Sequence, residues 1–65
     1  MSAYTIQYFH HSEKVFEETV FMQNILAVKV SATHQAPQHI IDIKVFDLMG
    51  HCIADRKQGQ WQKIK

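Results

Sequence analysis

The chain contains several stretches in which apolar and polar residues alternate. In residues 3–9 one face carries Tyr4, Ile6 and Tyr8, and the other carries Thr5 and Gln7. Such alternation, in a segment rich in aromatic and β-branched residues, predicts a β-strand. A polar turn is expected at residues 10–13, and a second, shorter strand at residues 15–18. The alternation of this second strand is imperfect because Val15 and Phe16 are adjacent.

The last third of the chain predicts three short strands joined by two turns. In the first of these strands Ile41, Ile43 and Val45 share one face. Asp47 can open a turn by hydrogen-bonding its own backbone, and Gly50 can close it with a positive φ. Gln58-Gly59 marks the second turn. Residues 40–64 therefore predict a meander, and the upstream segments must cover one of its faces.

Residues 19–35 fit two patterns. As a helix, they place Phe21, Ile25, Val28 and Ala32 on one stripe. As a strand, they alternate equally well from residue 26 to residue 33. The run lasts about seventeen residues without Gly or Pro, which is long for a strand of typically 5–6 residues. A meander also needs a second layer to bury its apolar face. We therefore predict a helix over residues 20–34, ended by Pro37.

The predicted fold class is α+β: an antiparallel sheet of four to five strands with one helix packed on one face. The expected element order is β-β-α-β-β-β in a single domain, residues 1–65, and the alternative is an all-β small barrel. The predicted core residues are Tyr4, Ile6, Tyr8, Phe21, Ile25, Val28, Ile41, Ile43 and Val45.

Composition limits the classes of protein that remain. The chain has 65 residues, 46% of them hydrophobic and 20% charged, which is typical of a compact domain. At this length a domain buries only roughly 60% of its unfolded surface, so its stability is marginal. A single cysteine excludes an internal disulfide and is compatible with a reducing compartment. With no signal peptide or membrane-length apolar run, a complete, cytoplasmic protein is expected.

The residues that could bind a partner follow from an uneven distribution of charge. The net charge is +1, but Glu13, Glu17, Glu18 and Lys14 give residues 1–22 a balance of −2, whereas residues 50–65 have a balance of +3. Cations beside amides and an aromatic ring suit phosphate contact and base stacking, although lysines also solvate edge strands and Trp61 can close the core. The candidate partner-binding residues are Arg56, Lys57, Gln58, Gln60, Lys63, Lys65 and, on the predicted helix, Lys29.

No residue pattern predicts catalysis, a metal or a cofactor. Structural zinc needs four convergent ligands, but His10-His11 and His51-Cys52 are adjacent pairs whose side chains point apart on a strand. His34 and His39 supply two ligands at most. Cys52 has no base in reach, since His51 faces away, and the adjacent Glu17 and Glu18 also face apart. We therefore expect no catalytic residue, no metal site and no cofactor.

The residues from Ile43 to Ala54, followed by Gly59-Gln60-Trp61, form the pattern V-x-D-x-x-G-x-x-I-A…G-x-W. This ending resembles that of many small bacterial and phage proteins. In size and element order the chain is similar to some type I-F anti-CRISPR proteins, which bind an RNA-guided surveillance complex. The resemblance implies a non-enzymatic phage or mobile-element inhibitor. The positively charged helix surface of that family is not reproduced, since this segment offers only Lys29.

Two functions are therefore expected as alternatives. The first is a small inhibitor or adaptor, monomeric or homodimeric, that binds a larger protein or nucleoprotein complex such as a CRISPR surveillance complex and does not contact membranes. The second is a nucleic-acid-binding module that uses the basic C-terminal hairpin. Under either hypothesis, changing Arg56 and Lys57 to Glu should weaken partner binding and make it less dependent on salt.

Overall fold

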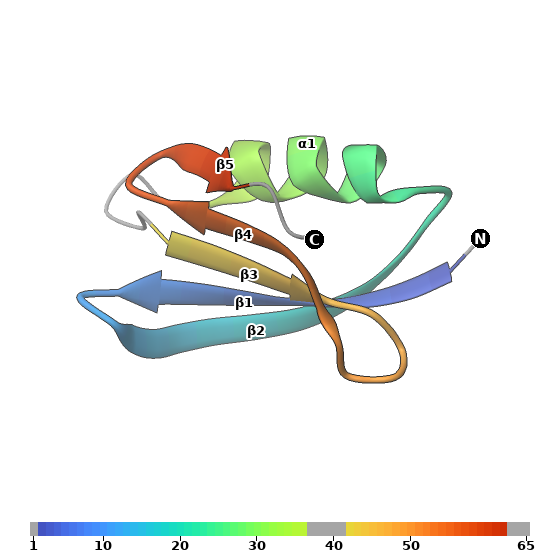
Figure 1. Ribbon diagram of the computed structural model, residues 1–65, viewed down its shortest axis with the longest axis horizontal. Helices are drawn as coiled ribbons and strands as arrows, with labels where there is room; N and C mark the ends of the chain where they lie inside the picture. The colour runs from blue at the N-terminus through green and yellow to red at the C-terminus, as the bar shows by residue number, and fades with distance from the viewer. Residues whose placement is uncertain (1, 37–41, 63–65) are drawn as a thin grey trace.

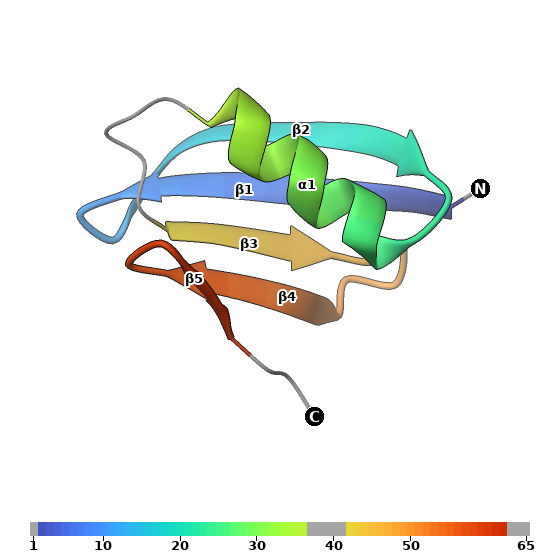
Figure 2. The same cartoon turned by 90° about the horizontal axis from the view of Figure 1, so that it is seen from above.

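The computed structural model describes residues 2–36 and 42–62. Along the chain the elements are β1 (Ser2–His10), β2 (Glu13–Met22), α1 (Ile25–Gln35), β3 (Asp42–Phe46), β4 (Cys52–Lys57) and β5 (Gln60–Gln62). The five strands form one open antiparallel sheet in the order β2-β1-β3-β4-β5, with α1 lying across one face (Figure 1; Figure 2). The predicted α+β class, the element order and the C-terminal meander are confirmed, and the alternative of a barrel is wrong.

Strand β1 is the centre of the fold. It pairs antiparallel with β2 on one side and with β3 on the other, so β2 and β3 run parallel to each other. Helix α1 lies in the connection between them and crosses over β1 (Figure 2). On the helix-facing side of β1, Ile6 and Tyr8 are buried. The second layer therefore packs on the middle of the sheet.

The core lies between α1 and the three strands β1, β3 and β4. Its buried residues are Ile6, Tyr8, Val28, Ala32, Ile43, Val45 and Ala54. The Tyr8 hydroxyl donates a 2.7 Å hydrogen bond to a carboxylate oxygen of Glu18 on β2. Burial, and then this bond and the charge of Glu18, raise the pKa of Tyr8 above its ordinary range. The one polar atom that Tyr8 carries into the core is thus satisfied.

The second strand is longer than predicted, and the helix begins later. Residues 19–22 continue β2 and pair with Ser2–Thr5 of β1. Val20 and Met22 pack against the core, and Phe21, between them, points to the opposite face and is exposed. The prediction of a helix over residues 20–34 is therefore wrong at its start. β-branched and aromatic side chains favour the strand here.

Asn24 fixes where the helix starts. Its backbone is extended, and its side-chain oxygen accepts a 2.9 Å hydrogen bond from the N–H of Ala27. This is an N-cap, which satisfies one of the amides left without a partner in the first turn. At the other end, the N–H of Ala36 donates to the Ala32 carbonyl and the chain turns extended. Pro37 follows in sequence and disfavours helix in the residue before it.

Two tight turns close the flanking hairpins. His11 and Ser12 have φ values of 52° and 67°, and Gln58 and Gly59 have φ values of 51° and 84°. Two successive residues with positive φ form the turn whose twist suits a two-residue hairpin. The predicted turn at residues 10–13 is correspondingly shorter, since His10 and Glu13 already belong to strands.

Most of the predicted core is confirmed. Ile6, Tyr8, Val28, Ile43 and Val45 are buried. Tyr4 and Ile25 are partly buried against the same cluster. Phe21 was wrongly placed in the core because it falls on the helical stripe of residues that are in fact divided between β2 and α1. Ile41 lies outside the described residues.

Ile43→Ala should lower the free energy of unfolding by roughly 2–5 kcal/mol, because the change leaves a cavity under α1. Chemical denaturation measures the loss. Leu26→Ala removes an exposed side chain from α1 and is the control, with an expected change within about 0.5 kcal/mol. Equal losses in both variants would show that Ile43 is not the more buried residue.

Asn24→Ala should cost about 1 kcal/mol of unfolding free energy, because the Ala27 amide loses its cap. Asn24→Asp keeps an oxygen acceptor and should recover most of the loss. Urea denaturation of both variants checks the helix boundary. A helix that began near residue 20 would place Asn24 in its interior, and Asn24→Ala would then be neutral or stabilising.

Candidate docking site at the apolar end

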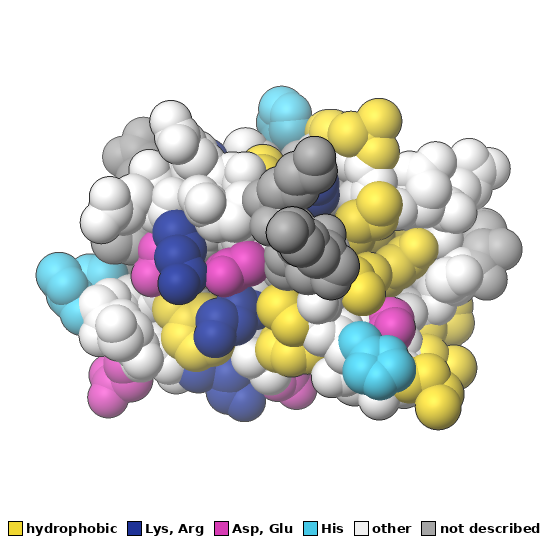
Figure 3. Space-filling model, in the orientation of Figure 1, with side chains coloured by type: hydrophobic (Ala, Val, Ile, Leu, Met, Phe, Trp, Pro, Cys, Tyr) yellow, Lys and Arg dark blue, Asp and Glu magenta, His cyan; other side chains and the backbone are white. Residues whose placement is uncertain are grey.

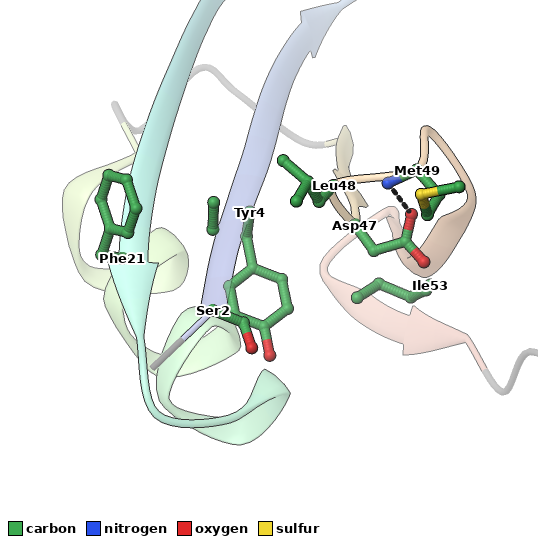
Figure 4. A pocket seen from close by; sticks show the side chains of 8 residues that line it. Ser2, Tyr4, Phe21, Asp47, Leu48, Met49 and Ile53 are labelled. Atoms are coloured by element: carbon green, nitrogen blue, oxygen red, sulfur yellow. Dashed lines mark hydrogen bonds between the residues drawn. The ribbon is translucent and has the colours of Figure 1, made fainter.

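One end of the molecule presents large hydrophobic side chains to solvent. The start of β1, the end of β2 and the β3–β4 turn meet there around a surface hollow of about 670 Å³. We call this region the apolar end and define it by the apolar residues that line the hollow: Ala3, Tyr4, Phe21, Leu48, Met49 and Ile53. Ser2 and Asp47 complete the lining (Figure 4). Three separate segments thus build one surface.

Phe21 is exposed because of its position in the sheet register. It lies on the face of β2 away from α1 and is 67% exposed. Its partner directly across on β1 is Ala3, whose methyl group is too small to cover an aromatic ring. The ring therefore borders the hollow with much of its surface in water.

Leu48 and Met49 occupy the middle of the β3–β4 turn and are 81% and 79% exposed. Turns of this kind usually carry polar residues, with Asp, Asn, Gly and Pro supplying the geometry. Here Asp47 and Gly50 supply it, so the two middle positions are free to hold large apolar side chains. Gly50 has a φ of 87°, which is the left-handed region that glycine adopts without strain.

Asp47 holds this turn in one conformation. Its Oδ1 accepts hydrogen bonds from the amides of Met49 and His51, at 3.0 and 2.8 Å. Its Oδ2 lies 3.4 Å from His51 Nδ1. Its backbone carbonyl accepts from Gly50 N–H, and its own N–H donates to the His51 carbonyl. The turn is therefore rigid although its apolar side chains are in solvent.

The hydrogen bond from the His51 amide contributes most to lowering the pKa of Asp47, with smaller contributions from the charge of His51 and the Met49 amide. All of these favour the ionised carboxylate. The turn is thus held by the ionised form of Asp47, which is present above its lowered pKa.

A bulge places the last member of the apolar end. The register between β3 and β4 moves from Val45 opposite Ala54 to Phe46 opposite Cys52, which leaves Ile53 as an extra residue on β4. Bulges re-aim side chains at the ends of sheets. Ile53 both packs against the core and lines the hollow.

A second, smaller hollow of about 250 Å³ lies between α1 and β5. Its lining residues are Leu26, Lys29, Val30, Thr33, His34 and Trp61. Trp61 packs against the core, and its Nε1 donates a 3.3 Å hydrogen bond to Thr33 Oγ1. Lys29 Nζ lies 5.6 Å from the centre of the Trp61 ring. Trp61 therefore joins β5 to the helix.

The structure separates the candidate binding residues predicted from charge. Arg56 and Lys57 are neighbours on β4, so their side chains leave opposite faces of the sheet. Lys57 Nζ lies 3.9 Å from Asp55, whereas Arg56 is partly buried and its Nε has no hydrogen-bond partner among the described residues. Gln58 and Gln60 are exposed at the β4–β5 turn, and Lys29 on α1 lies over the ring of Trp61, the residue after Gln60. Lys63 and Lys65 lie outside the described residues.

The sheet face opposite α1 changes character along its length. A polar row crosses all five strands there, formed in order by Glu17, Gln7, Lys44, Asp55 and Gln62. Gln7 and Lys14 both donate hydrogen bonds to Glu17, at 2.9 and 3.1 Å. In Figure 3 charged side chains of both signs lie together on the left, and most of the visible hydrophobic side chains gather on the right. Only the charged half of this face is well suited to water.

The histidines and the cysteine were expected not to form a metal site. Within residues 2–36 and 42–62, no three His, Cys, Asp or Glu side chains come close enough to hold a metal ion. The His10 and His11 rings do lie together, with centroids 4.2 Å apart, because His11 already belongs to the turn. The expectation that this pair points apart is therefore wrong. His39 lies outside the described residues.

The His51 ring is not directed at the Cys52 thiol, so it is not placed to act as its base. Cys52 is a free thiol whose Sγ lies 3.5 Å from the Ala54 carbonyl oxygen. The His51 ring instead faces Asp47.

No described helix is long and apolar enough to span a membrane.

No protein-family model, curated protein or solved structure matches this chain.

Titrating the protein with acid should release the β3–β4 turn. The pKa of Asp47 is depressed in the folded state, so its stabilisation is complete above about 3.9, the ordinary value for an aspartate, and is lost as the pH falls through the lower folded value. The backbone ¹⁵N shifts of Met49 and His51, followed by NMR, should move together with a midpoint below about 3.9. In Asp47→Asn this transition should be absent; a midpoint at or above 3.9 in the wild type would contradict the network.

Proposed function

We propose that this protein is a non-enzymatic binding protein, an inhibitor or adaptor of phage or mobile-element origin, that docks on a larger protein through its apolar end. The observation that carries the proposal is the convergence of Phe21, Leu48 and Met49 on one hollow. Single exposed hydrophobic residues are ordinary on protein surfaces, whereas a contiguous group marks an interaction surface. Aromatic residues and methionine are also enriched where proteins meet.

The hydrogen bonds that order the turn before binding support a role for it in docking. Binding normally costs about 0.5–1.5 kcal/mol for each flexible side chain that becomes ordered, in addition to the cost of ordering a loop. The four-residue turn that carries Leu48 and Met49 is already fixed by Asp47 and Gly50. Only the side chains of Leu48 and Met49 remain to be ordered, so most of their burial contributes to affinity.

The hollow suits a side chain of a partner protein better than a small substrate. Ligand and active sites combine an apolar lining with a few convergent polar groups. The polar side chains at this hollow are Ser2, Asp47 and the hydroxyl of Tyr4, and both carboxylate oxygens of Asp47 already contact the turn. A large apolar residue of a partner, surrounded by polar contacts, is the matching occupant.

The placement of the cations favours a protein partner over nucleic acid. Lys14 and Lys57 each lie close to a carboxylate, and Lys29 and Lys44 each lie over an aromatic ring. Phosphate binding requires cations on one surface that release counterions together. Of the five described cations, Lys14, Lys44 and Lys57 lie on the sheet face opposite α1, but Glu17, Asp42 and Asp55 lie among them, whereas Arg56 points to the helix side of the sheet and Lys29 lies on α1. The contacts of the four lysines with carboxylates and aromatic rings support the first of the two functions expected from the sequence.

The resemblance in size and element order to some type I-F anti-CRISPR proteins, inferred from the sequence, suggests the first partner to test, an RNA-guided surveillance complex. Purified complex would be mixed with this protein, and its binding to target DNA measured. Inhibition that saturates at a fixed stoichiometry is the expected result. If the complex neither binds the protein nor is inhibited by it, the partner suggested by the resemblance is wrong.

Protein and nucleic-acid partners can be distinguished by cross-linking from the apolar end. Met49→benzoylphenylalanine places a photoreactive group at the hollow without altering Asp47 or Gly50. In a host lysate treated with nuclease, it should cross-link one protein, and excess wild-type protein should abolish the product. Loss of all products on nuclease treatment would favour the nucleic-acid-binding alternative.

Leu48→Ser combined with Met49→Ser should weaken binding to the captured partner by about 30-fold or more, the effect of losing at least 2 kcal/mol at a hot spot. Both side chains are in solvent, so the melting temperature should hardly change. Calorimetry or surface plasmon resonance gives the affinity.

Leu26→Ser changes another large apolar residue that is mostly exposed, at 67% on α1, and as the control it should retain affinity. The pair Arg56→Glu and Lys57→Glu tests the basic hairpin in the same assay. If the hairpin variant loses affinity and the turn variant does not, the apolar end is not the docking site.

A further inference from the structure

The two edges of the sheet are very unequal. Strand β5 forms one edge and has three residues, whereas β2 forms the other and has ten. Within residues 2–36 and 42–62, strand β2 pairs with β1 alone, so its outer side carries a row of backbone donors and acceptors directed away from the sheet (Figure 2). Such an edge is a template for a further strand unless something blocks it.

Only half of this edge is blocked. In its first half the register shifts at Tyr8 and Phe9, which leaves Val15 as a bulge, and Lys14, Glu17 and Glu18 add charge. Bulges and charges, lysine above all, are the usual means of preventing edge pairing. The second half, residues 19–22, reads Thr-Val-Phe-Met and has no charge, no proline and no bulge.

We propose that the open half of β2 pairs antiparallel with the same strand of a second copy of this chain, about a two-fold axis at Val20. In this register Val20 faces Val20 of the second copy, and Thr19 faces Phe21. Glu18 faces Met22, so the paired segment is residues 18–22. The two sheets then form one continuous sheet, with both helices on the same side.

The charges of β2 select this register. Opposite residues of an antiparallel pair must have their side chains on the same face of the sheet. The two-fold axis therefore lies between one residue and the same residue of the second copy. An axis at Glu17 or Glu18 would place two identical carboxylates opposite each other, which is destabilising. An axis at Thr19 would bring both acids into the pairing, opposite Val20 and Phe21. An axis at Phe21 would leave only residues 20–22 within the strand. Val20 gives a pairing over residues 18–22 that contains one acid per chain, Glu18, and places no like charges opposite each other.

Phe21 gains the most from this arrangement. In the single chain its cross-strand neighbour is Ala3, which leaves the ring 67% exposed. In the dimer it also faces Thr19 of the second copy, and aromatic pairs with β-branched residues stabilise sheets. Because Phe21 also borders the hollow, the dimer places two apolar ends side by side. The dimer does not depend on the proposed partner, and Leu48→Ser with Met49→Ser should leave it intact.

Sedimentation of the full chain over micromolar to millimolar concentrations tests the dimer itself. The expected result is a concentration-dependent rise to twice the monomer mass. Thr19→Lys puts a cation at the start of the open half, next to the two-fold axis, and should raise the dissociation constant at least tenfold without changing the circular dichroism. Gln60→Lys makes a similar change on the exposed edge strand β5 and should not alter dimerisation. A chain that stays monomeric throughout overturns the proposal.

Cross-linking tests the register. In a Cys52→Ser background, Thr19→Cys and Phe21→Cys are prepared as separate proteins. Opposite residues have Cβ atoms about 4.5–5.5 Å apart and diagonal ones about 7–8 Å, so only opposite positions approach disulfide distance. The mixture should oxidise to a disulfide-linked dimer at least tenfold faster than either protein alone. Faster cross-linking of one variant with itself, or no cross-linking, would overturn the register at Val20.

Discussion

The fold depends on one helix covering one face of a five-stranded sheet. Eleven residues of α1 rise about 16 Å, whereas the ten residues of β2 extend about 33 Å. The helix therefore seals the middle of one face, where Ile6, Val28, Ile43 and Val45 are buried. The other face and the ends of the strands must be stable in water or be covered by something else. The polar row from Glu17 to Asp55 meets the first requirement, and the apolar end does not.

Local chemistry in the sequence predicted the elements well where hydrogen bonding and alternation agree. The alternation of residues 3–9, the Asp47 and Gly50 turn and the C-terminal meander could all be predicted from neighbouring residues alone. The segment before α1 could not, because Phe21 and Ile25 have helical spacing although a cap separates them. Asn24, directly before an apolar run, was the available indication of the boundary. Its amide oxygen satisfies Ala27, so the helix starts where its first free amide finds a partner.

The candidate site was harder to predict because it depends on register. The turn containing Leu48 and Met49 was predicted correctly, but its two large apolar residues attracted no functional prediction. That they belong to one apolar surface can be recognised only from the structure, in which strand pairing brings Ala3 and Phe21 to the same hollow. Charge is misleading for a related reason: Arg56 and Lys57 are adjacent in sequence, but a strand sends them to opposite faces. A sum of charges along the chain is therefore not a charge on a surface.

Marginal stability connects the exposed apolar end to the size of the domain. A chain of 65 residues has a small core, here closed partly by alanines at positions 32 and 54. Anything that binds only the folded state adds to its stability, by about 2.7 kcal/mol when the ligand is present at a hundred times its dissociation constant. For a domain of this size such an increment is a large fraction of the total. Phe21, Leu48 and Met49 contribute little to the isolated fold while they are in water. Their burial against a partner would therefore add the hydrophobic surface that a single helix is too short to cover.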